Sequence, residues 1–211
     1  TLLHEGIGVD YPSRRKSTAF YDAKMPTLYT EHLLIRRFSE EDLCAFHGTL
    51  TGDPDWWDRG TIEDARESLT FRIRQTRYNN PPLGYRAVVL QESQILIGTV
   101  GYDCYFLGRE ERCLFDESAY AQDSAHRTLE FGVGYFIAAE HRSRGFGAEA
   151  VRALIDFAFE SIGVQRLWAE TWHENRSSIE LMKRVGMRVG RNPDPEAWPG
   201  VFGVIERPPD S

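Results

Sequence analysis

The chain has 211 residues, 41% of them hydrophobic, which is enough for one globular domain with its own core. Its formal net charge of −7 argues against nucleic acid as the main partner, because proteins that neutralise phosphates are usually basic. No apolar run approaches the roughly 20 residues that a membrane span needs, so we expect no membrane association.

The acidic charge is compatible with a cationic substrate such as an amine, but solubility alone accounts for it more simply. The three cysteines (Cys44, Cys104 and Cys113) form no C-x-x-C pair, and residues 1–19 lack the layout of a secretory signal. These features predict a cytoplasmic protein with free thiols. The histidines show no metal-ligand spacing, so we expect no bound metal.

The N-terminal part predicts an extension over residues 1–27, followed by a single domain over residues 28–211. Ser39 and Thr61 are each followed three residues later by an aspartate, which resembles the capping box that begins many helices. The first predicted elements are a strand over 28–38 and helices over 39–50 and 61–78.

The middle of the chain predicts strands, because β-branched and aromatic residues are dense there. Gly98 and Gly101 indicate a bulge or a close approach of two backbones. The polar connection over 107–127 is long for a hairpin, and loops of that length are often functional. The strands are predicted over 85–90, 95–106 and 129–137.

The clearest helix follows the third of these strands. Its apolar residues recur at helical spacing, and Gly163 is suited to end it. The order of elements predicts an α/β fold with helices packed on a mixed sheet. The apolar stripe consists of Val151, Leu154, Ile155, Ala158, Phe159 and Ile162. The remaining elements are a strand over 166–172, a helix over 177–185 that ends at Gly186, and strands over 187–191 and 201–206.

A glycine-rich turn over residues 142–148 opens that helix. The first N–H groups of a helix have no internal partner, and the helix dipole adds partial positive charge there. Gly145 and Gly147 let the backbone approach a phosphate closely, while Arg142 and Arg144 add donors suited to phosphate oxygens. We therefore expect a pyrophosphate site. No G-K-[ST] follows the glycines, which disfavours a nucleoside triphosphatase loop.

Three motifs resemble the GNAT superfamily of N-acetyltransferases. Arg142, Gly145 and Gly147 fit its Q/R-x-x-G-x-G/A pattern, and the stretch from Asn175 to Met187 is similar to its N-x-x-S signature with the segment that follows. The run Thr30-Glu31-His32-Leu33-Leu34-Ile35-Arg36 resembles the start of the branch that contains ribosomal-protein alanine N-acetyltransferases. The resemblance covers roughly residues 28–206 and implies an acetyltransferase-like domain.

The resemblance implies a central mixed, mostly antiparallel sheet of about seven strands flanked by about four helices. It also implies that the strands over 129–137 and 166–172 splay apart. Acetyl-CoA would be the donor, and its pyrophosphate would bind the N–H groups of Ser143, Arg144, Gly145, Phe146, Gly147 and Ala148. The pantetheine would lie beside the strand ending at Ile137, facing Asn175, which is otherwise a helix N-cap.

The resemblance also suggests catalytic residues. Glu130 is the first candidate for the base that takes the amine proton, although the position usually acidic in this branch is Gly132. A backbone N–H near Ile137 or Ala138 would polarise the thioester carbonyl. Many relatives place a tyrosine proton donor where this chain has Met182, and the branch resembled uses the position of Ser178. The further candidates for the base are Asp103, Asp123 and His126.

Trp56 and Trp57 would line the acceptor site, or else pack in the core. The aspartates beside them favour a cationic acceptor. Trp168 and Trp172 alternate on a strand and are expected in the core.

Two functions are consistent with these features: acetyl transfer from acetyl-CoA to a primary amine, or a non-catalytic acyl-CoA-binding module. Relatives of this kind often form homodimers.

Overall fold

The computed structural model describes residues 25–51, 53, 56, 60–79, 81–108, 112–113, 127–194, 196 and 199–208. Most of the predicted extension and of the 107–127 connection lies outside these residues. Met25, which we expected in the extension, is buried in the main core and 2% exposed. The folded domain therefore includes residues before position 28.

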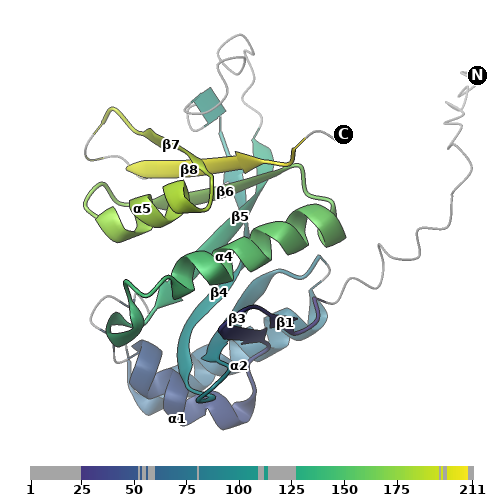
Figure 1. Cartoon of the computed structure of the whole chain (residues 1–211), viewed down its shortest axis with the longest axis vertical. Coiled ribbons are helices and arrows are strands. Elements are labelled where there is room, and N and C mark those ends of the chain that lie inside the picture. The colour runs from purple at the N-terminus through teal and green to yellow at the C-terminus, as the bar shows by residue number, and fades with distance from the viewer. Residues whose placement is uncertain are drawn as a thin grey trace, which may run out of the picture.

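One sheet of eight strands runs through the described part of the chain, in the order β1-β2-β3-β4-β5-β6-β8-β7. All neighbouring strands are antiparallel except β5 and β6. This confirms the predicted α/β class with a mixed, mostly antiparallel sheet (Figure 1). The strands are β1 Leu28–Tyr29, β2 Leu33–Arg36, β3 Gly84–Leu90, β4 Leu96–Leu107, β5 Thr128–Ile137, β6 Arg166–Thr171, β7 Arg188–Arg191 and β8 Val201–Glu206.

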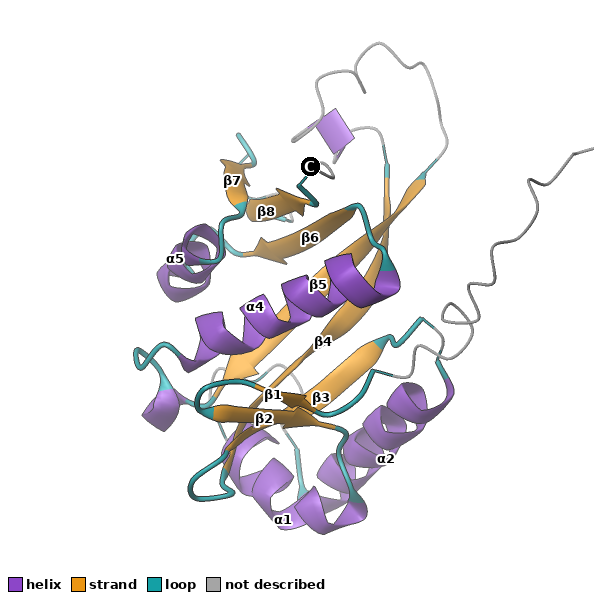
Figure 2. Ribbon diagram, turned by 45° about the vertical axis from the view of Figure 1, so that its right-hand side comes forward, coloured by secondary structure: helices purple, strands orange, loops and turns teal. Residues whose placement is uncertain are grey.

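Helices cover both faces of this sheet (Figures 1 and 2). Neighbouring residues of a strand point to opposite faces, and on β3 Val88 belongs to one core whereas Ala87 and Val89 belong to another. The first core contains residues of α4 and α5, and the second contains residues of α1 and α2. The helices are α1 Leu43–Phe46, α2 Ile62–Tyr78, α4 Phe146–Phe157 and α5 Arg176–Arg184.

Helix α4 follows the periodicity of its sequence. Val151, Leu154 and Ile155 are buried against the sheet, and each such side chain contributes roughly 1.5–3 kcal/mol when it leaves water. A wider π-helical turn, Ala158–Ile162, continues the helix to Gly163, whose φ of 81° ends it as predicted. This long, well-packed helix fixes the position of the glycine-rich turn at its start.

The predicted strand over 28–38 is divided, which explains why the sheet has eight strands where about seven were expected. Thr30 closes a turn, because its N–H donates to the Leu33 carbonyl at 3.0 Å and its Oγ1 accepts the Leu33 N–H at 3.1 Å. The chain therefore reverses between β1 and β2, and the two strands pair.

The two parallel strands β5 and β6 form a single residue pair, Gly132 with Trp168. Beyond it the strands diverge, as the resemblance implied. Trp168 is buried, as expected. The expectation for Trp172 is wrong: this residue is 56% exposed, because it follows Thr171, the last residue of β6, and lies outside the sheet. The divergence separates the facing edges of the two strands beyond this pair.

In the described part of the chain, no helix is long and apolar enough to cross a membrane, and no three His, Cys, Asp or Glu side chains gather as metal ligands would.

Candidate active site

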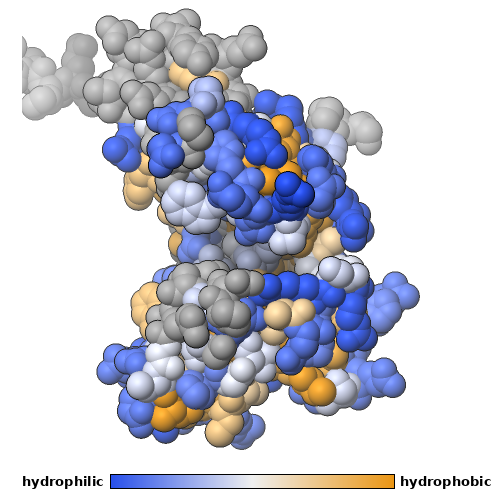
Figure 3. All heavy atoms as spheres, turned by 90° about the vertical axis from the view of Figure 1, so that its left-hand side faces the viewer, coloured by the Kyte–Doolittle hydropathy of each residue, from blue (hydrophilic) through white to orange (hydrophobic). Residues whose placement is uncertain are grey.

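Backbone N–H groups at the end of β5 face the gap between β5 and β6. The N–H of Ala138 donates to the Ile97 carbonyl of β4 at 2.9 Å, so it is used within the sheet. Because N–H groups alternate in direction along an antiparallel strand, those of Ile137 and Tyr135 point toward β6. Two N–H groups were expected to polarise the thioester carbonyl, and of these the Ile137 N–H faces the gap whereas the Ala138 N–H does not. Figure 3 views this side, and its surface is hollowed between an upper and a lower part.

The turn before α4 has the backbone shape of an anion site. Ser143 and Gly145 both have positive φ, 61° and 90°. A turn that includes left-handed residues directs successive N–H groups into one concavity, and here it runs directly into the positive end of a helix. A Cβ on Gly147 would lie 2.8 Å from the Leu181 side chain, so α4 and α5 approach closely there. The expected phosphate cradle therefore has suitable local geometry.

The two arginines of the turn have different surroundings. The Arg142 side chain points inward: its Nε donates to the Ile137 carbonyl at 2.7 Å, and its guanidinium pairs with buried Asp53. Arg144 is exposed, with its guanidinium carbon 4.9 Å from the centre of the Phe146 ring. Of the two expected phosphate donors, Arg144 is the one whose side chain lies open to solvent.

The N-terminal motif anchors the start of α4. The Glu149 carboxylate accepts hydrogen bonds from the Thr30 hydroxyl and from the His32 N–H at 2.5 and 2.8 Å, and it pairs with the His32 ring at 3.0 Å. Burial alone would raise the pKa of Glu149, but these bonds outweigh it and lower that pKa. The Thr30–His32 segment thus holds the cradle from the β1–β2 side.

Asn175 and Ser178 lie at the start of α5, which follows the diverging end of β6. The Asn175 side chain accepts the Ser178 N–H at 3.1 Å, which confirms its predicted role as a helix N-cap. The Ser178 hydroxyl lies 2.6 Å from that of Tyr135 on β5. Burial raises the pKa of Tyr135 to about 12, so its phenol stays neutral at physiological pH. The two hydroxyls join β5 to α5 across the gap.

On the opposite face of the sheet, two tyrosines lie across the glycines of β5. A Cβ atom at Gly132 would clash with the Tyr105 ring, and one at Gly134 would clash with the Tyr85 ring, so each tyrosine packs directly over a glycine. The Tyr85 hydroxyl donates to the Asp103 carboxylate at 2.6 Å. This places Asp103, a candidate base, one strand away from the point where β5 and β6 separate.

A second carboxylate on this face was not predicted. Glu170 lies on β6 and accepts the Trp168 indole N–H at 2.9 Å. Burial and the charges of Glu170 and Asp103 raise the pKa of Tyr105, so both carboxylates lie near its phenol. The alternation of Trp168, Glu170 and Trp172 in the sequence was the available signal, since it places Glu170 on one face with Trp168.

The structure does not bring Glu130 to this site. It lies two positions before Gly132, the residue that faces Asp103 across β4 and β5, and on the other side of the Gly132–Trp168 pair from Ile137. Glu130 is 6% exposed, and its carboxylate accepts hydrogen bonds from both Nε and Nη2 of Arg166, at 3.0 and 2.6 Å. The Glu130 carboxylate is thus already paired with Arg166, and its role as the base stays a prediction.

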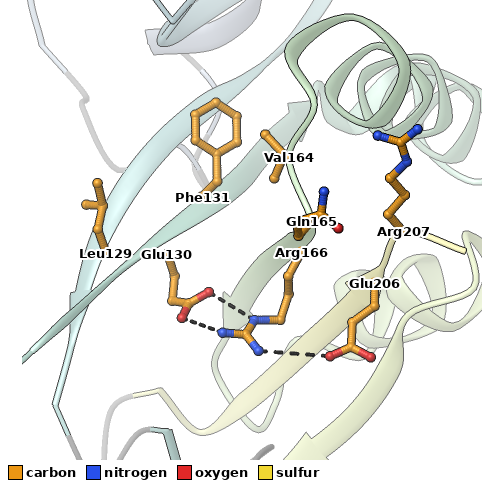
Figure 4. Close-up of a pocket in the computed structure, with 8 residues that line it drawn as sticks. All are labelled: Leu129, Glu130, Phe131, Val164, Gln165, Arg166, Glu206 and Arg207. Atoms are coloured by element: carbon orange, nitrogen blue, oxygen red, sulfur yellow. Dashed lines mark hydrogen bonds and ion pairs between the residues drawn. The ribbon is translucent and has the colours of Figure 1, made fainter. Parts of the chain in front are cut away.

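Glu130 instead lines a separate hollow of about 500 Å³ at the end of the sheet where β5 and β6 begin (Figure 4). Arg166 there also approaches Glu206 at 3.9 Å. The residues that line the hollow are Leu129, Glu130, Phe131, Val164, Gln165, Arg166, Glu206 and Arg207.

The structure places Trp56 in the core between the sheet and α1 and α2, where it is 2% exposed. Its ring packs edge-on against Phe136, with ring centres 4.7 Å apart. Of the two readings of this tryptophan, core packing is therefore the one observed. Trp57, Asp123 and His126 lie outside the described residues.

Comparison with known proteins agrees with this geometry. The family model for the acetyltransferase (GNAT) domain matches residues 32–188. An uncharacterized N-acetyltransferase of Bacillus licheniformis, p20, is 27% identical over 171 residues, which is 78% of this chain and 83% of that protein.

Two solved structures share the fold. A putative ribosomal-protein-serine acetyltransferase from Vibrio cholerae superposes with a TM-score of 0.63 at 19% identity, over 88% of this chain and 99% of that chain. The microcin C7 self-immunity acetyltransferase MccE, solved with acetyl-CoA and AMP, gives a TM-score of 0.58 at 11% identity, over 86% and 96%. The chain therefore belongs to the GNAT family and is an acyl-CoA-dependent acetyltransferase.

Proposed function

We propose that this protein transfers the acetyl group of acetyl-CoA to a primary amine, which attacks the thioester directly in a ternary complex. The acceptor is a protein N-terminus or a small amine. The observation that carries the proposal is the divergence of β5 and β6 beside the anion-binding turn, with the hydroxyls of Tyr135 and Ser178 across the gap.

The donor would be held mainly by backbone groups. The N–H groups of residues 143–148 would bind the pyrophosphate, and exposed Arg144 would add a charged donor. The pantetheine arm would lie along β5, where the N–H groups of Tyr135 and Ile137 face the gap. The Asn175 side chain would contact the same arm while it caps α5.

The acyl transfer requires stabilisation of two negative charges. The amine nitrogen forms a bond to the thioester carbon, and the Ile137 N–H would stabilise the oxyanion that develops there. When the carbon–sulfur bond breaks, Ser178 would give its hydroxyl proton to the CoA thiolate and regain one from solvent. Tyr135 stays protonated and would hold the Ser178 hydroxyl in place through their 2.6 Å contact.

The amine would approach from the face of Tyr85 and Tyr105. Asp103 is our proposed base, because its partly exposed carboxylate lies beside the point where the strands separate. With Glu170 nearby, this face carries negative charge that favours binding of a cationic amine, which releases one proton to solvent before attack because only the neutral amine is a nucleophile. Asp103 would take the proton that the amine loses on attack through ordered water, because its partner Gly132 lies five positions before Ile137, about 17 Å along β5. We propose no proton transfer through Glu130.

We infer a cytoplasmic setting for this reaction. The support is the presence of unpaired thiols, since Cys44 is exposed and Cys104 and Cys113 are partly exposed.

The experiment that tests the function measures thiol release from acetyl-CoA with a panel of primary amines. Ser178→Ala should lower kcat by about 100-fold on any amine that reacts. Ser177→Ala is the matched control: it removes the neighbouring hydroxyl, which bonds to Asn175 at 2.9 Å, and should leave kcat within about threefold. Equal kcat values for wild type and Ser178→Ala would exclude Ser178 as the acid. Binding of acetyl-CoA without turnover on any amine would favour the non-catalytic alternative.

A further inference from the structure

A buried carboxylate outside the proposed chemistry connects distant parts of the chain. Asp53 follows the helical segment that ends at Thr51, and its side chain is only 5% exposed. Its Oδ2 accepts the N–H of Ala139, 86 positions later, at 2.9 Å. Both carboxylate oxygens lie 3.4 Å from Nη2 of Arg142. The acidic partner of the glycine-rich turn thus comes from the segment between α1 and α2.

Arg142 extends this connection to the end of β5. Its Nε donates to the Ile137 carbonyl at 2.7 Å, and its guanidinium carbon lies 5.2 Å from the centre of the Phe136 ring. Phe136 in turn packs against buried Trp56. One guanidinium therefore bonds to both the last residue of β5 and Asp53.

The charge balance of this group separates it from the phosphate donors. The Asp53 carboxylate neutralises Arg142 at short range, so Arg142 offers little net positive charge to an anion. The pair instead fixes the backbone. Asp53 bonds to Ala139 and to Arg142, and this holds the chain immediately before Ser143 and Gly145, whose positive φ values shape the turn. A site that is already ordered avoids the entropy cost of ordering it on binding.

We propose that Asp53 is a positioning residue for the donor: through Ala139 and Arg142 it fixes the glycine-rich turn in the conformation that binds the pyrophosphate of acetyl-CoA. This inference rests on the proposed function, in which acetyl-CoA occupies that turn. Asp53 touches neither substrate, and it acts on the affinity for the donor and not on the chemical step.

The test compares Asp53→Asn with Asp42→Asn. Asp42 is a close structural match, because it is equally buried and accepts both an arginine side chain, Arg36 at 2.7 Å, and a backbone N–H, that of Ser39 at 2.8 Å. We expect both variants to lower the melting temperature. Only Asp53→Asn should raise the Kd for acetyl-CoA in calorimetric titration, by about tenfold, because one charged hydrogen-bond arrangement is lost. It should raise the KM for acetyl-CoA similarly and leave kcat at saturating donor within about twofold.

Two further variants distinguish positioning from charge. Asp53→Asn combined with Arg142→Gln should bind acetyl-CoA no more weakly than the weaker single variant, because both act through one contact. Kd should rise with salt as steeply in Arg142→Gln as in wild type, and less steeply in Arg144→Gln. A shallower salt dependence in Arg142→Gln would show that Arg142 contacts the phosphates and would overturn the proposal.

The outcomes for the two proposals differ. Wild-type protein that binds no acetyl-CoA would contradict the proposed function itself. Wild-type protein that binds acetyl-CoA, with Asp53→Asn binding equally well or Asp42→Asn binding as weakly as Asp53→Asn, would contradict only the role of Asp53.

Discussion

Replacement of Gly145 by alanine tests whether the positive φ of the turn matters for donor binding. Gly145 has a φ of 90°, and a Cβ added there would meet no atom within 4 Å, so the substitution introduces backbone strain without a clash. A left-handed conformation costs a non-glycine residue roughly 1–2 kcal/mol. Because the space around the turn is open, we expect the alanine variant to relax to negative φ in the unliganded protein.

Binding would then have to restore the left-handed conformation. The same 1–2 kcal/mol would be drawn from the binding energy, which corresponds to a rise in Kd for acetyl-CoA of about 5- to 30-fold. Calorimetric titration of acetyl-CoA measures this change directly.

Gly163→Ala is the matched control. Gly163 follows the last turn of the same helix, with a φ of 81° and no atom within 4 Å of a Cβ. The strain is therefore similar, but this end lies away from the proposed donor site. Gly163→Ala should lower the melting temperature and leave the Kd unchanged. A Kd for Gly145→Ala within twofold of the wild-type value would refute the reasoning.

Three other variants test the assignments above. Glu130→Gln should lower the free energy of unfolding by about 1–3 kcal/mol through its broken pair with Arg166, yet keep kcat within about twofold; a kcat loss near that of Asp103→Asn would restore Glu130 as the base. Glu149→Gln tests pH dependence: the folded-state pKa of Glu149 is lowered, so its stabilising effect is complete above about pH 5 and is lost as pH falls through that pKa. The difference in urea unfolding between wild type and Glu149→Gln should therefore shrink toward pH 3, and a difference that grows would contradict this sign. Trp56→Ala should cost about 3–5 kcal/mol of stability in urea unfolding if Trp56 is a core residue, and a loss below 1 kcal/mol would argue for a surface role.

Local patterns in the sequence were sufficient to predict most of the fold. The apolar stripe of α4 and its end at Gly163 depend on residues close in the chain, and both are observed. The expected close backbone approach at Gly98 is also present, since a Cβ there would clash with the Phe136 carbonyl oxygen. The turn at Thr30 was missed because the residues around it alternate as a continuous strand would.

Long-range partners could not be predicted in the same way. Alternation places Glu130 on a face of β5, but it does not reveal that Arg166 on the next strand captures its carboxylate. The motif spacing likewise identifies Arg142 without showing that its side chain turns inward to Asp53. These pairs join residues that only the assembled fold brings together, so the sequence indicates candidate residues and the structure assigns their partners.

The most direct test of the central claim is titration of the protein with acetyl-CoA, followed in the same sample by addition of primary amines with detection of free thiol. The account predicts saturable binding that Gly145→Ala weakens, and thiol release with at least one amine that Ser178→Ala suppresses. Absence of acetyl-CoA binding would contradict the assignment of the glycine-rich turn, and with it the proposed function.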